Sequence, residues 1–282
     1  MMRHILKKAK SLGAYQIVNL VLVTLLALVF VYPIVWLGLN SFKTQTEVYR
    51  LPPTFFPEYF TVENFQKIFL QNPAWLWIKN SMVTSLLTAG FTAVTGTMAA
   101  YAFSKLQFYG KKWLYGLFIL SIMVPTEILI VPLFNITKSL NLMDTSLGMA
   151  VPSIASAIGL FMMKGFIDAL PSSIRESARI DGAGELRIFL SIILPLCKSG
   201  MGALFILSFV RGWNNYLWQM LTATRKVSYT LPVGVSTLFT ESNPNIAYKL
   251  AGAFVGAVPM LIVFLCFQKY FTRGVTIGAE KG

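Results

Sequence analysis

Hydrophobic residues form six runs along the chain, each long enough to cross the apolar core of a bilayer as a helix. Such a crossing takes about 20 apolar residues, within a range of about 17–25. A segment exposed to lipid must satisfy its own backbone hydrogen bonds, which favours helices. The pattern therefore predicts an all-α membrane protein with six transmembrane helices, at Ile17–Leu39, Ser81–Phe103, Trp113–Phe134, Ser146–Met163, Ser199–Leu221 and Leu250–Phe267.

Lysine and arginine are unevenly distributed among the polar segments between these runs. Of the 24 basic residues, 15 lie in the termini and in the alternate loops that an even number of spans places on one side. The opposite loops hold 8, spread over more residues. The positive-inside rule predicts a multi-pass protein of the cytoplasmic (inner) membrane with both termini in the cytoplasm. This asymmetry explains much of the net charge of +13, so we expect no nucleic-acid partner.

The composition identifies the lipid bilayer as the main surroundings of this chain. Hydrophobic residues make up 55% and charged residues only 12%, whereas a soluble domain has about 25% charged residues. His4 is the only histidine, and Cys197 and Cys266 are too few for a disulfide framework. The sequence contains no G-x-x-x-x-G-K-[ST] loop, no G-x-S-x-G turn and no Cys/His pair. We therefore expect no catalytic residue, no metal site and no cofactor in this chain.

The spans and loops divide the chain into three parts. Residues 1–79 contain the N-terminal tail, the first transmembrane helix and an outer loop rich in proline and aromatic residues, which we expect to fold as a small packed lid. Residues 80–272 form a core of five transmembrane helices, and residues 273–282 form a cytoplasmic tail. A large cytoplasmic loop, residues 164–198, lies inside the core.

Residues 170–196 of this loop have the pattern of two short helices around a glycine turn. Ser173 and Glu176 form a capping-box pair at the expected start of the first helix. The helix should end at Gly182–Gly184, and a second should run from Glu185 to Pro195. Small residues on the exposed face of the first helix, Ala178 among them, would let this helix dock closely into a groove of a partner protein. An amphipathic loop helix lying on the membrane surface is the alternative interpretation.

The loop resembles the EAA loop of permeases in binding-protein-dependent ABC importers. Glu176-Ser177-Ala178, three residues, Gly182, nine residues and Ile192-Ile193-Leu194-Pro195 follow the family pattern, with Ser177 replacing one alanine. In that family the loop is a coupling helix that docks on the ATP-hydrolysing subunit. The resemblance implies that this chain couples to an ATPase through Glu176, Ser177, Ala178, Asp181, Gly182, Leu194 and Pro195.

The resemblance covers nearly the whole chain. In particular, the chain is similar to sugar-importer permeases of the MalG type. Asn40–Thr44, Trp213-Asn214 and Gly278–Gly282 all carry it. It implies the type I ABC importer permease fold, with a second homologous permease, two ATP-binding subunits, an extracytoplasmic solute-binding protein and a sugar substrate. ATP and Mg would be bound by the partner subunits. The tail residues Glu280, Lys281 and Gly282 are implied as a further ATPase contact.

Two charges lie at membrane depth, where an ionised group is costly unless it faces protein or a water-filled path. They are Glu127, between two prolines, and Arg211. Six candidate residues for a substrate path are Glu127, Arg211, Trp213, Asn214, Asn215 and Tyr216. An Arg211–Glu127 pair, or a polar contact with the partner permease, is the alternative.

The sequence thus predicts a permease subunit that forms half of the translocation path of an ATP-driven importer for a sugar or oligosaccharide. The main alternative is a secondary transporter driven by an ion gradient, which would use paired intramembrane carboxylates or discontinuous helices from repeats. A membrane enzyme for lipid-linked sugars is a second alternative. Such an enzyme needs an acidic or histidine constellation at the membrane interface, and the sequence shows none.

Overall fold

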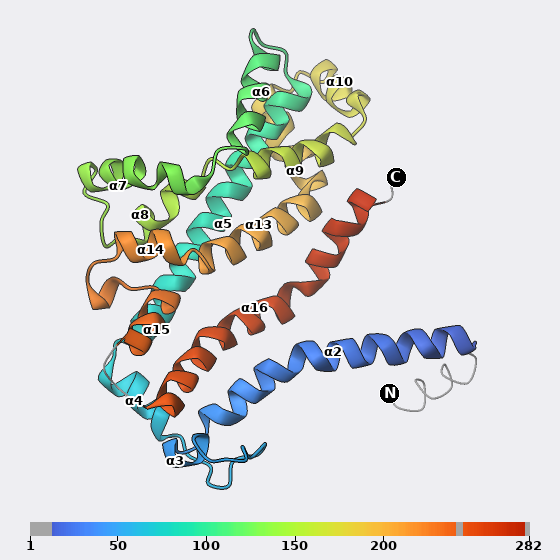
Figure 1. The fold of residues 1–282 in the computed structure, drawn as a ribbon. Coiled ribbons are helices and arrows are strands. Elements are labelled where there is room, and N and C mark those ends of the chain that lie inside the picture. The colour runs from blue at the N-terminus through green and yellow to red at the C-terminus, as the bar shows by residue number, and fades with distance from the viewer. Residues whose placement is uncertain (1–12, 241–244, 280–282) are drawn as a thin grey trace. The chain divides into compact units, whose positions relative to one another are not determined.

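A computed structural model describes residues 13–240 and 245–279, and side chains from 15 to 239 and 245 to 267. The described part is helical and contains no strand (Figure 1). The α-helices are α2 (Ala14–Ser41), α3 (Gln45–Val48), α4 (Glu63–Gln71), α5 (Ala74–Lys105), α6 (Lys111–Ser121), α7 (Ile130–Ser139), α8 (Ser146–Ala150), α9 (Ala157–Asp168), α10 (Ser172–Ile180), α11 (Glu185–Ile188), α12 (Leu194–Leu196), α13 (Lys198–Trp213), α14 (Tyr216–Thr222), α15 (Leu231–Thr240) and α16 (Ile246–Ala279). The 3₁₀ segments are η1 (Thr126–Leu129), η2 (Val151–Ser153) and η4 (Lys226–Ser228), and η3 (Phe189–Ile193) is a π-helix.

The helices occupy the six predicted apolar runs, but only half of the runs are single helices. Three helices are long and apolar enough to cross a membrane: Tyr15–Ser41, Ala74–Lys105 and Ile246–Phe267. Three bent pairs satisfy the same test: Lys111–Ser121 with Thr126–Ser139 (96°), Ser146–Ser153 with Ala157–Asp168 (57°), and Glu185–Leu196 with Lys198–Trp213 (78°). The all-α membrane fold is confirmed, while the third, fourth and fifth runs are broken.

The breaks occur where the sequence cannot continue the hydrogen-bond ladder. In the third run Pro125 has no N–H and disfavours the helical conformation of the residue before it, so α6 ends at Ser121. In the fourth run the side chain of Ser156 accepts a hydrogen bond from the Gly159 N–H at 3.1 Å and starts α9 afresh. These two runs are therefore bent pairs of helices rather than single straight ones.

The predicted fifth span, Ser199–Leu221, is also not a single helix. Helix α13 ends at Trp213, and α14 begins only at Tyr216. At the break, Asn214 turns its side-chain amide back onto the Val210 carbonyl at 3.0 Å. Such a side-chain bond competes with continuation of the backbone ladder, which explains the interruption.

The described chain divides into two compact units, 13–72 with 245–257, and 73–240 with 258–279. In the first unit the outer loop is packed as expected. The Lys43 ammonium is buried, donates to the Thr54 carbonyl at 2.5 Å and lies 5.2 Å from the centroid of the Trp36 ring. The buried Glu47 carboxylate accepts from the Glu58 N–H at 2.8 Å. This polar network gives the proline-rich loop a fixed shape.

In the second unit, α5 is the helix against which α9 and α13 pack (Figure 1). Small residues line the packing face of α5, where Ala89, Ala93 and Ala100 are buried. A Cβ added to Gly96 would lie 3.2 Å from the Gly159 carbonyl carbon. Helices in lipid associate through such close contacts because burial from water does not drive them together.

The α5–α9 crossing should therefore tolerate no larger side chain. We expect Gly96→Leu to lower the free energy of unfolding by about 1–3 kcal/mol, the usual effect of overpacking. The matched control is Gly90→Leu on the same helix, where an added Cβ meets nothing within 4 Å. Thermal unfolding of the full-length chain in detergent measures both. Equal melting temperatures for the two variants would contradict a close crossing at Gly96.

Candidate functional site

Helix α10 forms the first half of the predicted EAA loop, but it begins differently from the expectation. The helix starts at Ser172, with Pro171 before it and no side-chain cap hydrogen bond. The predicted capping box of Ser173 and Glu176 was wrong. Because the cap is Pro171 and the helix begins two residues earlier than expected, Ser173 is the second helical residue rather than the flanking cap. Pro171 suffices at this position, since its fixed φ suits the entry to a helix.

The end of α10 follows the predicted glycine turn. Gly182 adopts a φ of +78°, which side chains disfavour. Its N–H donates to the Arg179 carbonyl at 3.0 Å, and the Ala183 N–H donates to the Ala178 carbonyl at 2.9 Å. These two bonds form a Schellman motif, which satisfies the last carbonyls and fixes the direction in which the chain leaves.

The two faces of α10 have different surroundings. Glu176, Ser177, Asp181 and Gly182 are exposed, as the docking prediction requires. Ala178 is 7% exposed and lies in a cluster of buried residues from its own chain. The expectation that Ala178 lies on the exposed face was therefore wrong. Its small side chain lets α10 approach the rest of the second unit instead of a partner.

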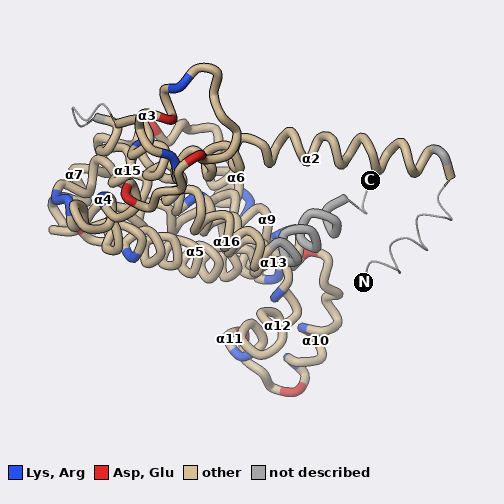
Figure 2. The backbone as a smooth tube through the Cα atoms, turned by 90° about the horizontal axis from the view of Figure 1, so that it is seen from below, with Lys and Arg blue, Asp and Glu red and all other residues tan. Residues whose placement is uncertain are grey.

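The second half of the loop is one helical run, Glu185–Leu196, with a π segment in its middle. Ile188, Phe189 and Ile193 are buried in the same cluster as Ala178. Leu194 is partly buried and Pro195 is exposed, close to the end of the run as predicted. Figure 2 shows α10, α11 and α12 grouped as one lobe that carries several charges.

Glu185 connects the parts of this lobe, and sequence reasoning missed this role. Its Oε1 accepts from Arg175 Nη2 at 2.5 Å, and its Oε2 accepts from Arg175 Nε at 3.2 Å. The Tyr101 hydroxyl on α5 also donates to Oε2, at 2.5 Å. Opposite charges on either side of the glycine turn were visible in the sequence, but Tyr101 is 84 residues away.

The residues predicted for a substrate path do not form one surface. Glu127 and Arg211 are exposed and form no ion pair with each other. Trp213 is only 2% exposed, and its ring stacks on Phe209 at a centroid distance of 6.0 Å. The expectation that Trp213 is available to stack on a sugar was therefore wrong for this conformation.

The remaining residues of that group lie at the break between α13 and α14. Asn214 is exposed, Asn215 is half-buried and Tyr216 is 39% exposed. The tail residues Glu280, Lys281 and Gly282 lie outside the described residues. The alternative of an Arg211–Glu127 pair is contradicted, because their side chains are not bonded to each other.

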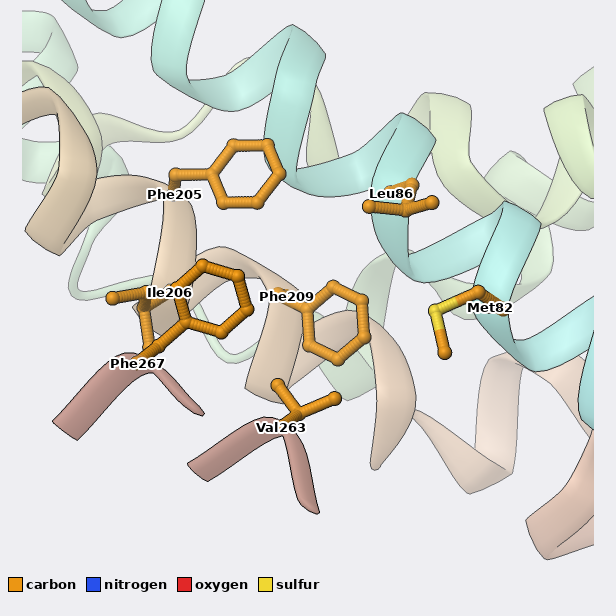
Figure 3. Close-up of a pocket in the computed structure, with 7 residues that line it drawn as sticks. All are labelled: Met82, Leu86, Phe205, Ile206, Phe209, Val263 and Phe267. Carbon is orange, nitrogen blue, oxygen red and sulfur yellow. The ribbon is translucent and has the colours of Figure 1, made fainter. Parts of the chain in front are cut away.

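A small apolar pocket of about 80 Å³ lies among α5, α13 and α16 (Figure 3). Its lining is Met82, Leu86, Phe205, Ile206, Phe209, Val263 and Phe267. These side chains offer no hydrogen-bond donor or acceptor beyond the weak thioether of Met82. A sugar hydroxyl buried there would lose its hydrogen bonds to water without replacement. The pocket is therefore unsuited to a carbohydrate.

A polar latch joins two loops of the second unit. Asp144 accepts from the Thr224 N–H at 2.7 Å, from the Thr224 hydroxyl at 2.6 Å and from the Arg225 N–H at 3.0 Å. Burial raises the pKa of Asp144, but these hydrogen bonds outweigh it and hold the pKa below its usual value.

Apolar helices sufficient for several spans are interrupted by a polar lobe whose leading helix packs on its own core and exposes Glu176 and Arg179. This is the organisation of a multi-pass membrane protein with a charged lobe that a partner chain can contact.

Residues 92–277 match the family described as binding-protein-dependent transport system inner membrane component. The chain belongs to this family, and it is a permease subunit of an ABC importer rather than an enzyme. As the family description states, it is an inner membrane component.

Known relatives match along almost their full lengths. The chain is 32% identical to the arabinooligosaccharides transport system permease protein AraQ of Bacillus subtilis, over 98% of this chain and 100% of the relative. It is 28% identical to the lactose transport system permease protein LacG of Rhizobium radiobacter, over 94% and 96%. It is 30% identical to the sn-glycerol-3-phosphate transport system permease protein UgpE of Yersinia pestis, over 90% and 93%.

Solved structures show the same fold. A chain of a bacterial ABC transporter involved in the import of the acidic polysaccharide alginate superposes with a TM-score of 0.79. It is 22% identical and covers 91% of this chain and 96% of that chain. A chain of the inward-facing MetNI methionine ABC transporter gives 0.55 at 12% identity, over 76% and 99%. At these identities the likeness establishes the fold alone.

The left-handed Gly182 should be essential to the shape of the lobe. We expect Gly182→Ala to destabilise the local fold by about 1–2 kcal/mol, the cost of a left-handed conformation for an L-residue. The matched control is Gly184→Ala, because Gly184 has a φ of −70° and both glycines have open space around them. Hydrogen–deuterium exchange of the α10 amides reports the difference. Equal exchange in both variants would contradict the role of the turn.

The Asp144 latch should make stability depend on pH. Because its native pKa is lowered, the ionised latch stabilises the fold above the unfolded pKa of about 3.9. This stabilisation is lost as the pH falls through the native pKa. We expect the melting temperature of wild type to exceed that of Asp144→Asn at pH 7, with the gap closing in acid. A gap independent of pH would contradict this assignment.

Proposed function

We propose that this permease subunit takes part in the import of a sugar or oligosaccharide and forms half of its translocation path. The proposal is supported by the relatives named for arabinooligosaccharides and lactose. The sn-glycerol-3-phosphate relative shows that the same fold family also serves a smaller, phosphorylated compound. The observation that carries the coupling part of the proposal is α10, whose residues Glu176 and Ser177 are exposed while Ala178 holds the helix to its own chain.

The working assembly contains this chain, a second homologous permease, two ATP-binding subunits and an extracytoplasmic solute-binding protein. The ATP-binding subunits hold ATP and Mg. In our proposal the ATP-binding subunits dock on Glu176, Ser177, Asp181 and Gly182. Ala178, Leu194 and Pro195 support that surface from within the same loop. Glu280, Lys281 and Gly282 are proposed as a second ATPase contact.

The orientation in the membrane follows from the distribution of basic residues. We place both termini and the EAA loop in the cytoplasm, where the positive-inside rule puts basic loops. Residues 1–79 then carry the packed outer loop toward the binding protein, residues 80–272 form the core, and residues 273–282 form the tail. ATP-driven closure of the two ATPase subunits would push α10 and rock the core between inward-open and outward-open states. Such a switch requires that ATP and the loaded binding protein each favour one state over the other.

The substrate path is proposed at the break between α13 and α14, with Arg211, Asn214, Asn215 and Tyr216 facing it and Glu127 as a further polar group. Trp213 would reach a sugar only if the core rearranges, because its ring is buried here. The three broken spans do not single out a secondary transporter, because a chain of an ABC transporter shares this fold with a TM-score of 0.79. The paired intramembrane carboxylates of a secondary transporter have no counterpart, since Glu127 is the single acidic residue in the six predicted spans.

ATP hydrolysis by the assembled transporter in nanodiscs tests this proposal. The probes are a candidate solute-binding protein together with arabinotriose, lactose or sn-glycerol-3-phosphate. We expect one of the two glycosides to stimulate hydrolysis in wild type. We also expect Glu176→Lys to reduce ATPase docking by more than tenfold, since a misplaced charge at an interface costs about 2–5 kcal/mol.

The matched control for charge is Glu176→Asp, which should retain docking. Stimulation by sn-glycerol-3-phosphate alone would contradict the sugar assignment. Wild-type docking in the Glu176→Lys variant would show that α10 is not the ATPase contact.

A further inference from the structure

We propose that Glu185 is the positioning residue that makes the coupling helix α10 move as one body with the membrane helix α5. This proposal rests on the proposed function, because it explains how a push on α10 reaches the core. Glu185 itself lies outside the EAA signature residues, and its two oxygens are directed into its own chain rather than toward a partner.

The first link joins α10 to α11. The guanidinium of Arg175 donates through both Nη2 and Nε to the two oxygens of Glu185. The Arg175 side chain is only 19% exposed. A bidentate pair of this kind fixes orientation as well as distance, because a planar donor fork meets a planar acceptor. Arg179 adds a longer contact, with its Nε 3.9 Å from Oε1.

The second link joins Glu185 to α5. Tyr101 lies in the last turns of that helix and is 5% exposed. Its hydroxyl donates to Glu185 Oε2, while its ring lies 5.4 Å from the ring of Phe189 on the π segment. One residue of α5 therefore meets the lobe through both a hydrogen bond and a ring contact.

A third contact closes the arrangement from the other end of the lobe. The Lys105 ammonium, at the last residue of α5, donates to the Leu170 carbonyl just before α10 at 2.7 Å. The chain entering α10 and the chain leaving it are thus both tied to the same end of α5.

These links span the glycine turn. Gly182 and Gly184 separate α10 from α11, and no neighbouring atom lies within 4 Å of where their Cβ atoms would be. The turn itself is held by its two Schellman hydrogen bonds and by Ala183, which packs against the buried cluster. The apolar contact of Ala178 with the core is small and non-directional, so it resists separation better than rotation. The Arg175–Glu185 pair spans the turn, and α10 cannot swing about the glycines without breaking it.

A spin-label measurement tests this arrangement without requiring a known substrate. Labels are placed at Ser173→Cys on α10 and Met98→Cys on α5, both exposed positions outside the proposed docking surface, with Cys266→Ser in the background and Cys197 buried. The complete transporter in nanodiscs is measured without nucleotide and with ATP and vanadate. In wild type we expect one narrow distance in both states, because α10 travels with α5.

In Glu185→Gln we expect a second distance, displaced by about one helical turn, ~5 Å, in the ATP–vanadate state, with ATPase co-purification unchanged. Tyr101→Phe should give a weaker version of the same change, since it removes only one link. The matched control Arg187→Gln removes an exposed charge from the same helix and should behave as wild type. The exchange Arg175→Glu with Glu185→Arg should restore the single distance, which general destabilisation would not allow.

A single wild-type distance in the Glu185→Gln variant would overturn the proposal, as would an equal change in Arg187→Gln. Loss of ATPase from the Glu185→Gln complex would also overturn it, because Glu185 would then support docking rather than transmission. Failure of wild type to bind any ATPase would instead contradict the proposed function, and the two failures are therefore distinguishable.

Discussion

The close approach of helices to α5 is the constraint on which the second unit depends. A Cβ added to Gly96 would press on the Gly159 backbone, and one added to Gly212 would press on Ser85 and Thr88, so neither position has space for a larger side chain. In a bilayer this contact replaces the hydrophobic burial that holds soluble proteins together. Because α9 and α13 are both fixed to α5, the polar lobe between them is fixed as well.

The lobe combines a tight glycine turn with contacts on both sides of it. The glycines at 182 and 184 allow the chain to reverse sharply between two short helices. Buried Ala178, Ile188 and Phe189 hold the inner faces together, and Glu185 supplies the directional contacts. Glu176 and Asp181 lie on the outer side of the lobe and are exposed, so they are available to a partner.

The region around Trp213 illustrates how a local pattern can suggest the wrong surroundings. An arginine, an aromatic ring and two amides in succession are suited to a sugar. However, the helix turns each successive residue by about 100°, and Trp213 therefore packs on Phe209 while Arg211 and Asn214 face outward. The residue types in this segment suit a substrate path, but the helical periodicity places these residues on different faces of the helix.

The sequence by itself determined the class of fold, the positions of the six apolar segments and the EAA loop with its glycine turn. These depend on local properties: run length, charge placement and the left-handed preference of glycine. The tertiary structure decided that Ala178 faces inward and that Glu185 meets Tyr101. These depend on contacts between residues far apart in the chain, such as the 84 residues that separate Tyr101 from Glu185. No local pattern specifies such a pair, because its geometry exists only once α5 and the lobe are packed together.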